Sequence, residues 1–178
     1  MKHLIALALL AGMAFPLQAQ PNAALSYWQA FALLPDMNDD VRQELRDWAT
    51  LELNDDVRKG VAGANMALDF AAKGARIEHC DWNVDWNAGF VALLPHLSKA
   101  RLMSYVIGLK ARTLLAVGDG DGAVDQLLNG LALARHTGTD RIFVSLLVQN
   151  LLEKGYHDFI LAHLGHFNES QLTRLSAG

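Results

Sequence analysis

Apolar residues recur at helical spacing along nearly the whole chain after residue 20, and no run alternates as a half-buried strand would. The first helix is predicted at about 22–34, because Pro35 ends the periodic stretch. Its apolar face is formed by Leu25, Trp28, Phe31 and Ala32. The pattern therefore predicts an all-α fold, an irregular stack of antiparallel helices built from helical hairpins.

The sequence "NDDVR" occurs at 38–42 and again at 54–58, and each copy is typical of a helix start. The asparagine can cap the helix, and the two aspartates favour the positive end of the helix dipole. The inward residues of the first of these helices are predicted to be Val41, Leu45, Trp48 and Leu51. Those of the second, which is expected to continue to Gly74, are Val57, Val61, Ala64, Leu68 and Ala71. The copies are too close for a repeat unit, and similar capping chemistry explains them.

Residues 75–92 form the one long irregular connection in this pattern. Further helices are predicted at about 96–117, 123–135, 140–153 and 156–164. A last helix opens at Asn168 or Ser170 and has one or two turns before the sequence ends. Such a short last helix is consistent with a piece of a longer protein.

Residues 104–137 fit the helix-turn-helix template of tetratricopeptide repeats. The small, large and turn positions of that template are occupied by Ala111, Leu114, Gly118, Ala123, Leu127 and Gly130. Small residues at such positions allow two helices to approach closely. Lys110 and Arg135 depart from the template, and no second copy follows at the same period. The prediction is therefore one tetratricopeptide-like hairpin, closely packed over about 97–135.

The first nineteen residues have the three parts of a secretory signal peptide. Lys2 and His3 give a basic start, an apolar run from Leu4 to Phe15 follows, and small Ala19 is the expected cleavage point. That run is too short to cross a membrane as a helix, and no later stretch approaches the ~20 apolar residues that a span requires. We therefore predict an exported, periplasmic or extracellular protein with no membrane span in the mature chain.

Removal of residues 1–19 from the 178 leaves 159, enough for a single helical domain at 20–178 that needs no disulfide. The formal charge changes from −4 to −5 because Lys2 is lost, and the basic residues are scattered. This distribution argues against nucleic acid as a partner. The single cysteine, Cys80, cannot form an internal disulfide, so it is buried, free or paired with another chain, and a small buried side chain is the favoured interpretation.

The stretch "HCDWNVDWN" at 79–87 falls within the irregular connection. We interpret it as a structural loop that is held across the helical stack by Trp82 and Trp86, with Cys80 beneath the two rings. Asp81 and Asp85, with the asparagines that follow them, are then expected to bond backbone groups in consecutive turns. The alternative is that the two indoles are exposed and anchor a partner.

The residues that carry oxygen in this stretch also stand at positions 1, 3, 5 and 7 of a would-be calcium loop. Trp86 occupies the position that requires glycine, and Ala92 the position that requires an acid. "GDGDGAVD" at 118–125 fails in the same way. Near the end of the chain, a helix that stops at Gly165 would separate His163 from His166, so solvated histidines are expected there. No metal and no cofactor is predicted.

Four stretches resemble recurring blocks of a group of exported bacterial all-helical proteins. They are "NAALSYWQAFALLPDM", "CDW", "LLPHLSKAR" and "GAVDQLLNGLALARH", and the resemblance extends over most of residues 22–152. It implies export and a helical architecture. No catalytic residue is established for that group, so the resemblance implies none for this chain.

Two functions follow from these observations. The first is a noncatalytic exported protein that binds another protein, because stacked helical pairs present a concave surface. The second is a small hydrolase or redox enzyme in which a histidine activates Cys80. The sequence neighbours His79 and Asp81 rarely give that geometry, so His96 or His136 would have to approach Cys80 from elsewhere in the chain.

Overall fold

The computed structural model describes residues 20–85, 87, 94–140 and 142–177. Within these residues the chain is helical and contains no strand, so the predicted all-α fold is confirmed. The helices are α1 (Ala23–Leu33), α2 (Asp39–Glu44), α3 (Asp55–Gly63), α4 (Asn65–Ala75), α5 (Pro95–Ala116), α6 (Gly120–Thr137), α7 (Phe143–Ala162) and α8 (Glu169–Ala177). Short 3-10 turns follow α2 at Leu45–Asp47 and α7 at Leu164–His166.

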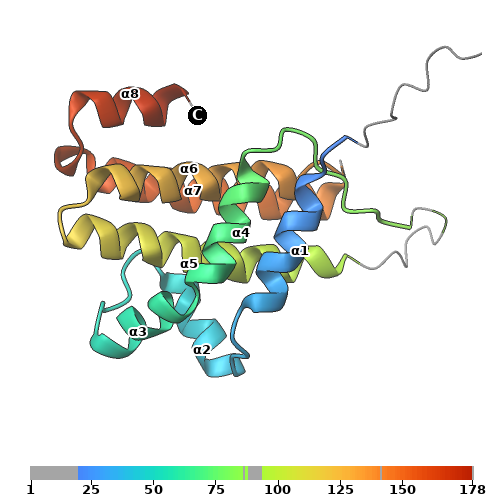
Figure 1. The fold of residues 1–178 in the computed structure, drawn as a ribbon, viewed down its shortest axis with the longest axis horizontal. Helices are drawn as coiled ribbons and strands as arrows, with labels where there is room; N and C mark the ends of the chain where they lie inside the picture. The colour runs from blue at the N-terminus through green and yellow to red at the C-terminus, as the bar shows by residue number, and fades with distance from the viewer. Residues whose placement is uncertain (1–19, 86, 88–93, 141, 178) are drawn as a thin grey trace, which may run out of the picture.

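Helix α6 lies at the centre of the fold and contacts α5, α7, α4 and α8. The three long helices α5, α6 and α7 run side by side, and α1 and α4 cross them steeply (Figure 1). At the lower edge in that view, α3 packs on α5 and α2 lies beside it. The apolar core is therefore enclosed between the long helices and the shorter helices of the first half of the chain.

The predicted hairpin is present as α5 and α6. Pro95 stands at the first turn of α5, where its missing N–H leaves no bond unmade. Gly118 has a φ of +84°, which lets the chain turn sharply, and the Asp119 carboxylate then caps α6 by accepting a bond from the Gly122 N–H. The small and large residues of the hairpin are buried at Ala111, Ala123 and Leu127 and half-buried at Leu114.

Gly130, which the template assigns to the packing of the hairpin, lies against α7. A Cβ atom added there would lie 2.1 Å from Tyr156 Cζ. The Tyr156 hydroxyl continues past α6 to α5, where it donates to Ser104 O at 2.7 Å. Because Gly130 has no side chain, the Tyr156 ring of α7 can pass close to α6 and bond to α5.

The prediction of two helices at 140–153 and 156–164 was wrong, because α7 is one continuous helix over this region. It continues through Gly155, although glycine costs about 1 kcal/mol relative to alanine inside a helix. Leu152, Tyr156 and Phe159 are buried on one face, and the contacts made by this face offset that cost. Trp48 lies directly against the same face, with its ring close to those of Tyr156 and Phe159.

The prediction of one helix from Asn54 to Gly74 was also wrong, because the chain bends at Ala64 into α3 and α4. Helix α3 packs on α5, whereas α4 packs on α1 and α6, and a straight helix would not bury both faces. Gly60 and Gly63 weaken the helix just before the bend.

The predicted inward face of α1 is only partly confirmed. Phe31 is buried and Trp28 is partly buried, whereas Leu25, with 67% of its surface exposed, and Ala32 point to solvent. Tyr27 and Ala30, which were not predicted, are buried. The segment AALSYWQAFAL is apolar on nearly every side, so its periodicity could not identify the inward face. In α2, Val41 is likewise 39% exposed instead of inward.

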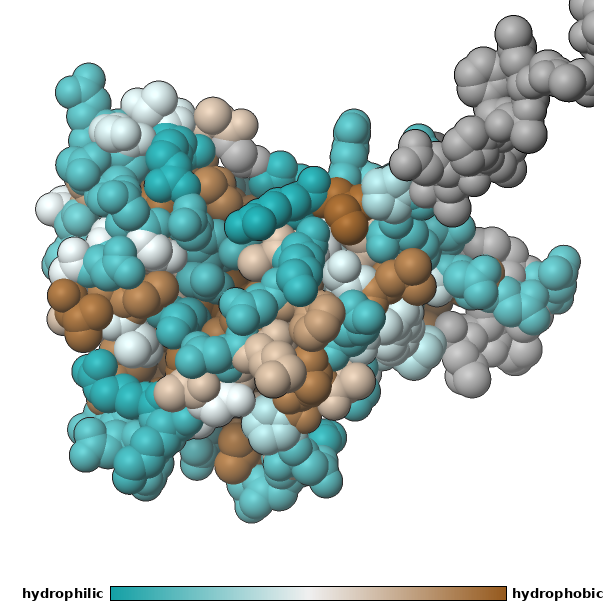
Figure 2. Space-filling view, viewed as in Figure 1, coloured by the Kyte–Doolittle hydropathy of each residue, from teal (hydrophilic) through white to brown (hydrophobic). Residues whose placement is uncertain are grey.

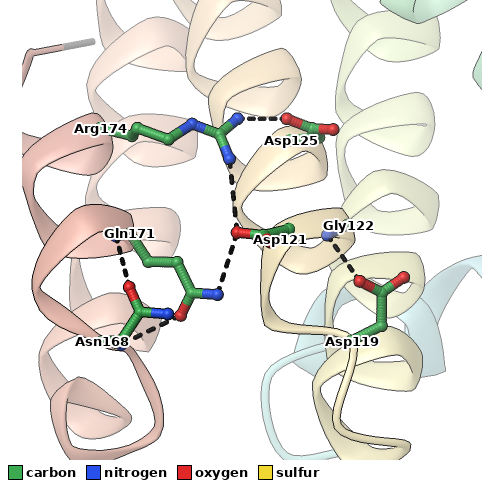
Figure 3. Close-up of polar contacts among 7 residues, drawn as sticks. All are labelled: Asp119, Asp121, Gly122, Asp125, Asn168, Gln171 and Arg174. Carbon is green, nitrogen blue, oxygen red and sulfur yellow. Dashed lines mark hydrogen bonds and ion pairs between the residues drawn. The ribbon is translucent and has the colours of Figure 1, made fainter.

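Helix α8 docks on the first turns of α6 through side chains of both helices (Figure 3). Asn168 and Gln171 cap α8 reciprocally, each side chain accepting a bond from the backbone N–H of the other. Gln171 also donates to Asp121 Oδ1 at 3.0 Å, and Arg174 pairs with Asp121 and Asp125. The acidic "GDGDG" segment is thus used for capping and helix docking.

Within the described residues, no helix combines the length and the hydropathy that crossing a membrane requires. Helix α7 does carry an exposed apolar row near its start, formed by Phe143, Val144, Leu147 and Leu151.

Candidate functional site

The irregular segment at residues 76–85 is tied to the start of α1. His79 O accepts a bond from Ala23 N at 2.9 Å. The side chain of Asn22 donates to Asp81 O at 2.8 Å and accepts from Asp81 N at 2.9 Å, and it also caps α1 by accepting from Ala24 N. One asparagine side chain therefore begins the helix and fixes the path of the segment.

Trp82 is buried beneath this segment, with 4% of its surface exposed, as the structural-loop interpretation requires. Its ring stacks on His96, with centroids 4.7 Å apart, and lies nearly parallel to Phe31 at 6.1 Å. The indole Nε1 donates to His136 O at 2.7 Å. Trp86, the second indole of that interpretation, lies outside the described residues.

Tyr27 and His136 form a buried pair in the same cluster. The Tyr27 hydroxyl lies 2.8 Å from His136 Nδ1, and His136 Nε2 lies 3.3 Å from Glu78 O. Because a carbonyl oxygen can only accept, Nε2 carries the proton and the hydroxyl donates to Nδ1. Burial lowers the pKa of His136, which keeps this imidazole neutral, and burial raises the pKa of Tyr27.

His96 faces Asp140 on the other side of Trp82. His96 Nε2 lies 2.9 Å from Asp140 Oδ2, and the two side chains are 1% and 6% exposed. Burial lowers the pKa of His96 to about 4. Burial also raises the pKa of Asp140, the charge of Asp81 raises it further, and the nearby Ser145 hydroxyl lowers it. The lowered pKa of His96 keeps the imidazole neutral. The two atoms are close without hydrogen-bond geometry, and among the described residues neither His96 Nε2 nor Asp140 Oδ2 has a hydrogen-bond partner.

Cys80 lies in this cluster with 7% of its surface exposed. The pKa of its thiol is raised to about 12, mainly by burial and also by the charges of Asp140 and Asp81, while the Ala24 N–H lowers it. Since the thiolate is the nucleophilic form, this environment keeps Cys80 unreactive at neutral pH. Both ring nitrogens of His136, moreover, lie against groups other than the sulfur, and His96 Nε2 lies against Asp140.

The four sequence blocks that carry the resemblance meet in this cluster. Tyr27, Trp82, His96 and His136 each come from a different block, and Trp82 contacts the other three. In this chain the blocks therefore share a structural task, which is to hold residues 76–85 against α1, α5 and α6.

The carboxylates of the same segment bond the backbone. Asp81 Oδ1 accepts from Asn83 N at 2.8 Å, where the chain takes a positive φ of 54°, and Asp85 Oδ1 accepts from Asn87 N at 3.0 Å. These are the consecutive turns expected from the sequence. In the described part of the chain, no three His, Cys, Asp or Glu side chains are grouped as metal ligands.

A groove of about 540 Å³ lies between α2, α3 and α5, and the sequence analysis did not predict it. Its apolar lining consists of Pro35, Met37, Val41, Leu45, Leu51, Val57, Val61, Ala64, Val106 and Leu109. Leu45, Val61, Val106 and Leu109 are buried, whereas Met37, Leu51 and Val57 are only partly covered. The volume is in the range of ligand-binding clefts.

The two copies of "NDDVR" build this groove. Asn38 caps α2 and Asn54 caps α3, each accepting a bond at 2.9 Å from the N–H of the valine three residues later. Both asparagines and both valines, Val41 and Val57, line the groove. The repeat was therefore a signal for the groove, although the sequence alone identified only its capping role.

Carboxylates surround the apolar lining. Asp36, Glu44 and Asp56 line the groove and are exposed, and the described lining residues include no basic side chain. Residues 36–56 contain eight acidic and two basic residues, a local balance of −6 in a chain whose total is −4. Hydrophilic side chains cover most of the lower edge over α2 and α3, with hydrophobic residues between them (Figure 2).

Comparison with protein families, curated proteins and solved structures found no match to this chain. The geometry of the groove and of the buried cluster is therefore the basis for a functional conclusion.

Proposed function

We propose that this chain is a noncatalytic exported protein that binds another protein in the groove between α2, α3 and α5. The observation that carries the proposal is the groove itself, a concave apolar surface of about 540 Å³. When a partner covers apolar side chains that are partly exposed in a cleft, the removal of apolar surface from water stabilises the complex. Val41, Met37, Leu51 and Val57 are such side chains.

The helical architecture supports this role. The α5–α6 hairpin carries Ala111, Gly118, Ala123 and Leu127 at the positions of a tetratricopeptide-like unit, and we propose that it is one. Helical stacks of this kind commonly bind partners on a concave surface. Here α5 supplies Val106 and Leu109 to the floor of the groove, while the flanking helices supply its walls.

The catalytic alternative has less support. It requires a reactive thiolate at Cys80, and burial raises the pKa of that thiol to about 12. Cys80, Tyr27, His96 and His136 are each at least nine-tenths buried, which leaves no room for a substrate to reach the sulfur. The buried cluster instead explains how the structure is held together.

Export is the part of the proposal that rests on residues 1–19, which lie outside the described residues. The basic start, the apolar run and Ala19 support it. Mass spectrometry of protein recovered outside the cytoplasm should give an N-terminus at or near Gln20. An intact Met1 on that protein would contradict export.

A matched pair of glycines in α3 tests the groove. Gly60 lines it and Gly63 does not, and a Cβ atom added at either position would meet nothing within 4 Å. Gly60→Leu should place a side chain in the groove and Gly63→Leu should not. Both variants should fold, because leucine is a better helix former than glycine.

The readout is fluorescence titration with Nile red, a neutral apolar dye that responds to apolar clefts. The wild type and Gly63→Leu should bind the dye saturably, and Gly60→Leu should bind it at least ~10-fold more weakly because the cleft is filled. Equal binding by all three proteins, or no saturable binding by the wild type, would contradict the proposed binding site.

A further inference from the structure

We propose that the segment bound in the groove is a basic, amphipathic stretch of the partner protein, with apolar side chains on one face and lysine or arginine beside them. This inference rests on the proposed function and adds the chemistry of the partner. It follows from the groove having two kinds of surface, an apolar floor and a carboxylate rim.

The floor selects apolar side chains. Leu45, Val61, Val106 and Leu109 form a surface that offers no charged group, so a polar segment placed there would lose hydrogen bonds to water without replacing them. An amphipathic helix that lays its apolar face in a groove is a common solution to this requirement.

The rim selects positive charge. Asp36 and Asp56 have fully exposed carboxylates, and each forms a loose ion pair, Asp36 with Arg42 at 3.7 Å and Asp56 with Lys59 at 3.9 Å. Such exposed pairs are weak and screened, so the carboxylates stay open to a partner. Glu44 is exposed beside the same lining.

The charge of the whole chain strengthens this selection. Without residues 1–19 the chain carries a net charge of −5, and residues 35–64, which form the walls of the groove, carry −4 of it. The negative potential is therefore concentrated around the groove, where it accelerates the approach of a basic segment and disfavours an acidic one.

Three fluorescent synthetic peptides of about twelve residues, or three helical turns, provide the test. The first has leucine on one helical face and lysine on the other, the second has glutamate for each lysine, and the third has serine for each leucine. In anisotropy titrations at low salt, the first peptide should bind at least ~10-fold more tightly than either of the others, and added salt should weaken it.

Charge variants of the protein locate the effect. A triple variant of the groove should lower the affinity for the lysine peptide at least ~5-fold; its substitutions are Asp36→Asn, Glu44→Gln and Asp56→Asn. A control triple variant should keep that affinity within about twofold of the wild type; its substitutions are Asp69→Asn, Glu78→Gln and Asp85→Asn. The second set removes the same three charges from exposed positions away from the groove. Gly60→Leu should abolish binding of the lysine peptide, and Gly63→Leu should not.

Several results would overturn the inference. Equal affinity for the lysine and glutamate peptides would contradict charge selection, while retained Nile red binding in the groove would leave the proposed function standing. Loss of Nile red binding but not of peptide binding in Gly60→Leu would show that the peptide binds elsewhere. Sedimentation velocity measures self-association. If the wild type self-associates and Gly60→Leu does not, a second copy of the chain occupies the groove instead.

Discussion

Trp82 shows how a segment without regular structure is held in place by one residue. Its ring lies between the aromatic side chains of α1 and the imidazole of His96, and its Nε1 bonds the last turn of α6. The sequence favours burial of Trp82 and Trp86, because burial removes a large apolar area from water, over the alternative that exposed indoles bind a partner. The partners of the ring come from distant segments and were not predicted.

We expect Trp82→Ala to lower the free energy of unfolding by about 3 to 5 kcal/mol, because it leaves a cavity among stacked rings and removes a bond to His136 O. Urea unfolding followed by circular dichroism measures the loss. The exposed His79 in the same segment gives the control, His79→Ala, which should change stability by less than about 0.5 kcal/mol. Similar stability of Trp82→Ala and the wild type would show that the segment does not depend on the indole.

The buried histidines predict how stability depends on pH. His96 has a pKa of about 4 in the folded chain against an ordinary value of 6.5, so between these values the unfolded state binds more protons. The free energy of unfolding should therefore fall by about 1 to 2 kcal/mol from about pH 7 to about pH 5, and the lowered pKa of His136 acts in the same direction. The raised pKa of Asp140 offsets part of this loss.

Urea titrations across this range test the prediction. A variant at the exposed His157, His157→Gln, should keep the wild-type pH profile. Stability that increases on acidification would show instead that His96 and Asp140 form a charged pair.

At the scale of helices, local signals predicted the starts better than the ends. Asn22, Asn38, Asn54 and Asn168 stand at predicted starts, and each caps the helix that follows it. Helix α6, capped by Asp119, begins three residues before its predicted start at 123. These caps depend on a few neighbouring residues, which is why the sequence reveals them. The bend at Ala64 and the continuity of α7 through Gly155 depend on which helices each face contacts, and that information is not local.

Two glycines test the packing of α7 against its neighbours. Gly130→Ala should cost about 1 to 3 kcal/mol or more, because the added Cβ would overlap the Tyr156 ring. Gly155→Ala should stabilise the protein by about 0.5 to 1 kcal/mol, because its Cβ would lie 3.8 Å from the nearest atom, Trp48 Nε1, and alanine favours the helix. Melting curves of the two variants should therefore shift in opposite directions. Shifts in the same direction would contradict this account of the α6–α7 contact.

At the scale of the whole molecule, the groove arises only when separate parts of the chain come together. Its walls come from residues 35–64 and its floor includes Val106 and Leu109 of α5. The net charge of the whole chain, −4, does not reveal that residues 36–56 alone carry a net charge of −6. The sequence predicted the fold class and an irregular connection held by Trp82, but a concave surface shared by three helices could not be predicted from periodicity.

The central claim is that another protein binds in this groove. Its most direct test is photo-crosslinking in a bacterium that exports the protein, with benzophenylalanine placed at Val57 in the groove or at Val117, which is 68% exposed at the end of α5. The account predicts a discrete adduct with another protein from position 57, none from position 117, and loss of the adduct when Gly60→Leu fills the groove. An adduct that forms equally from both positions, or that persists in Gly60→Leu, would contradict it.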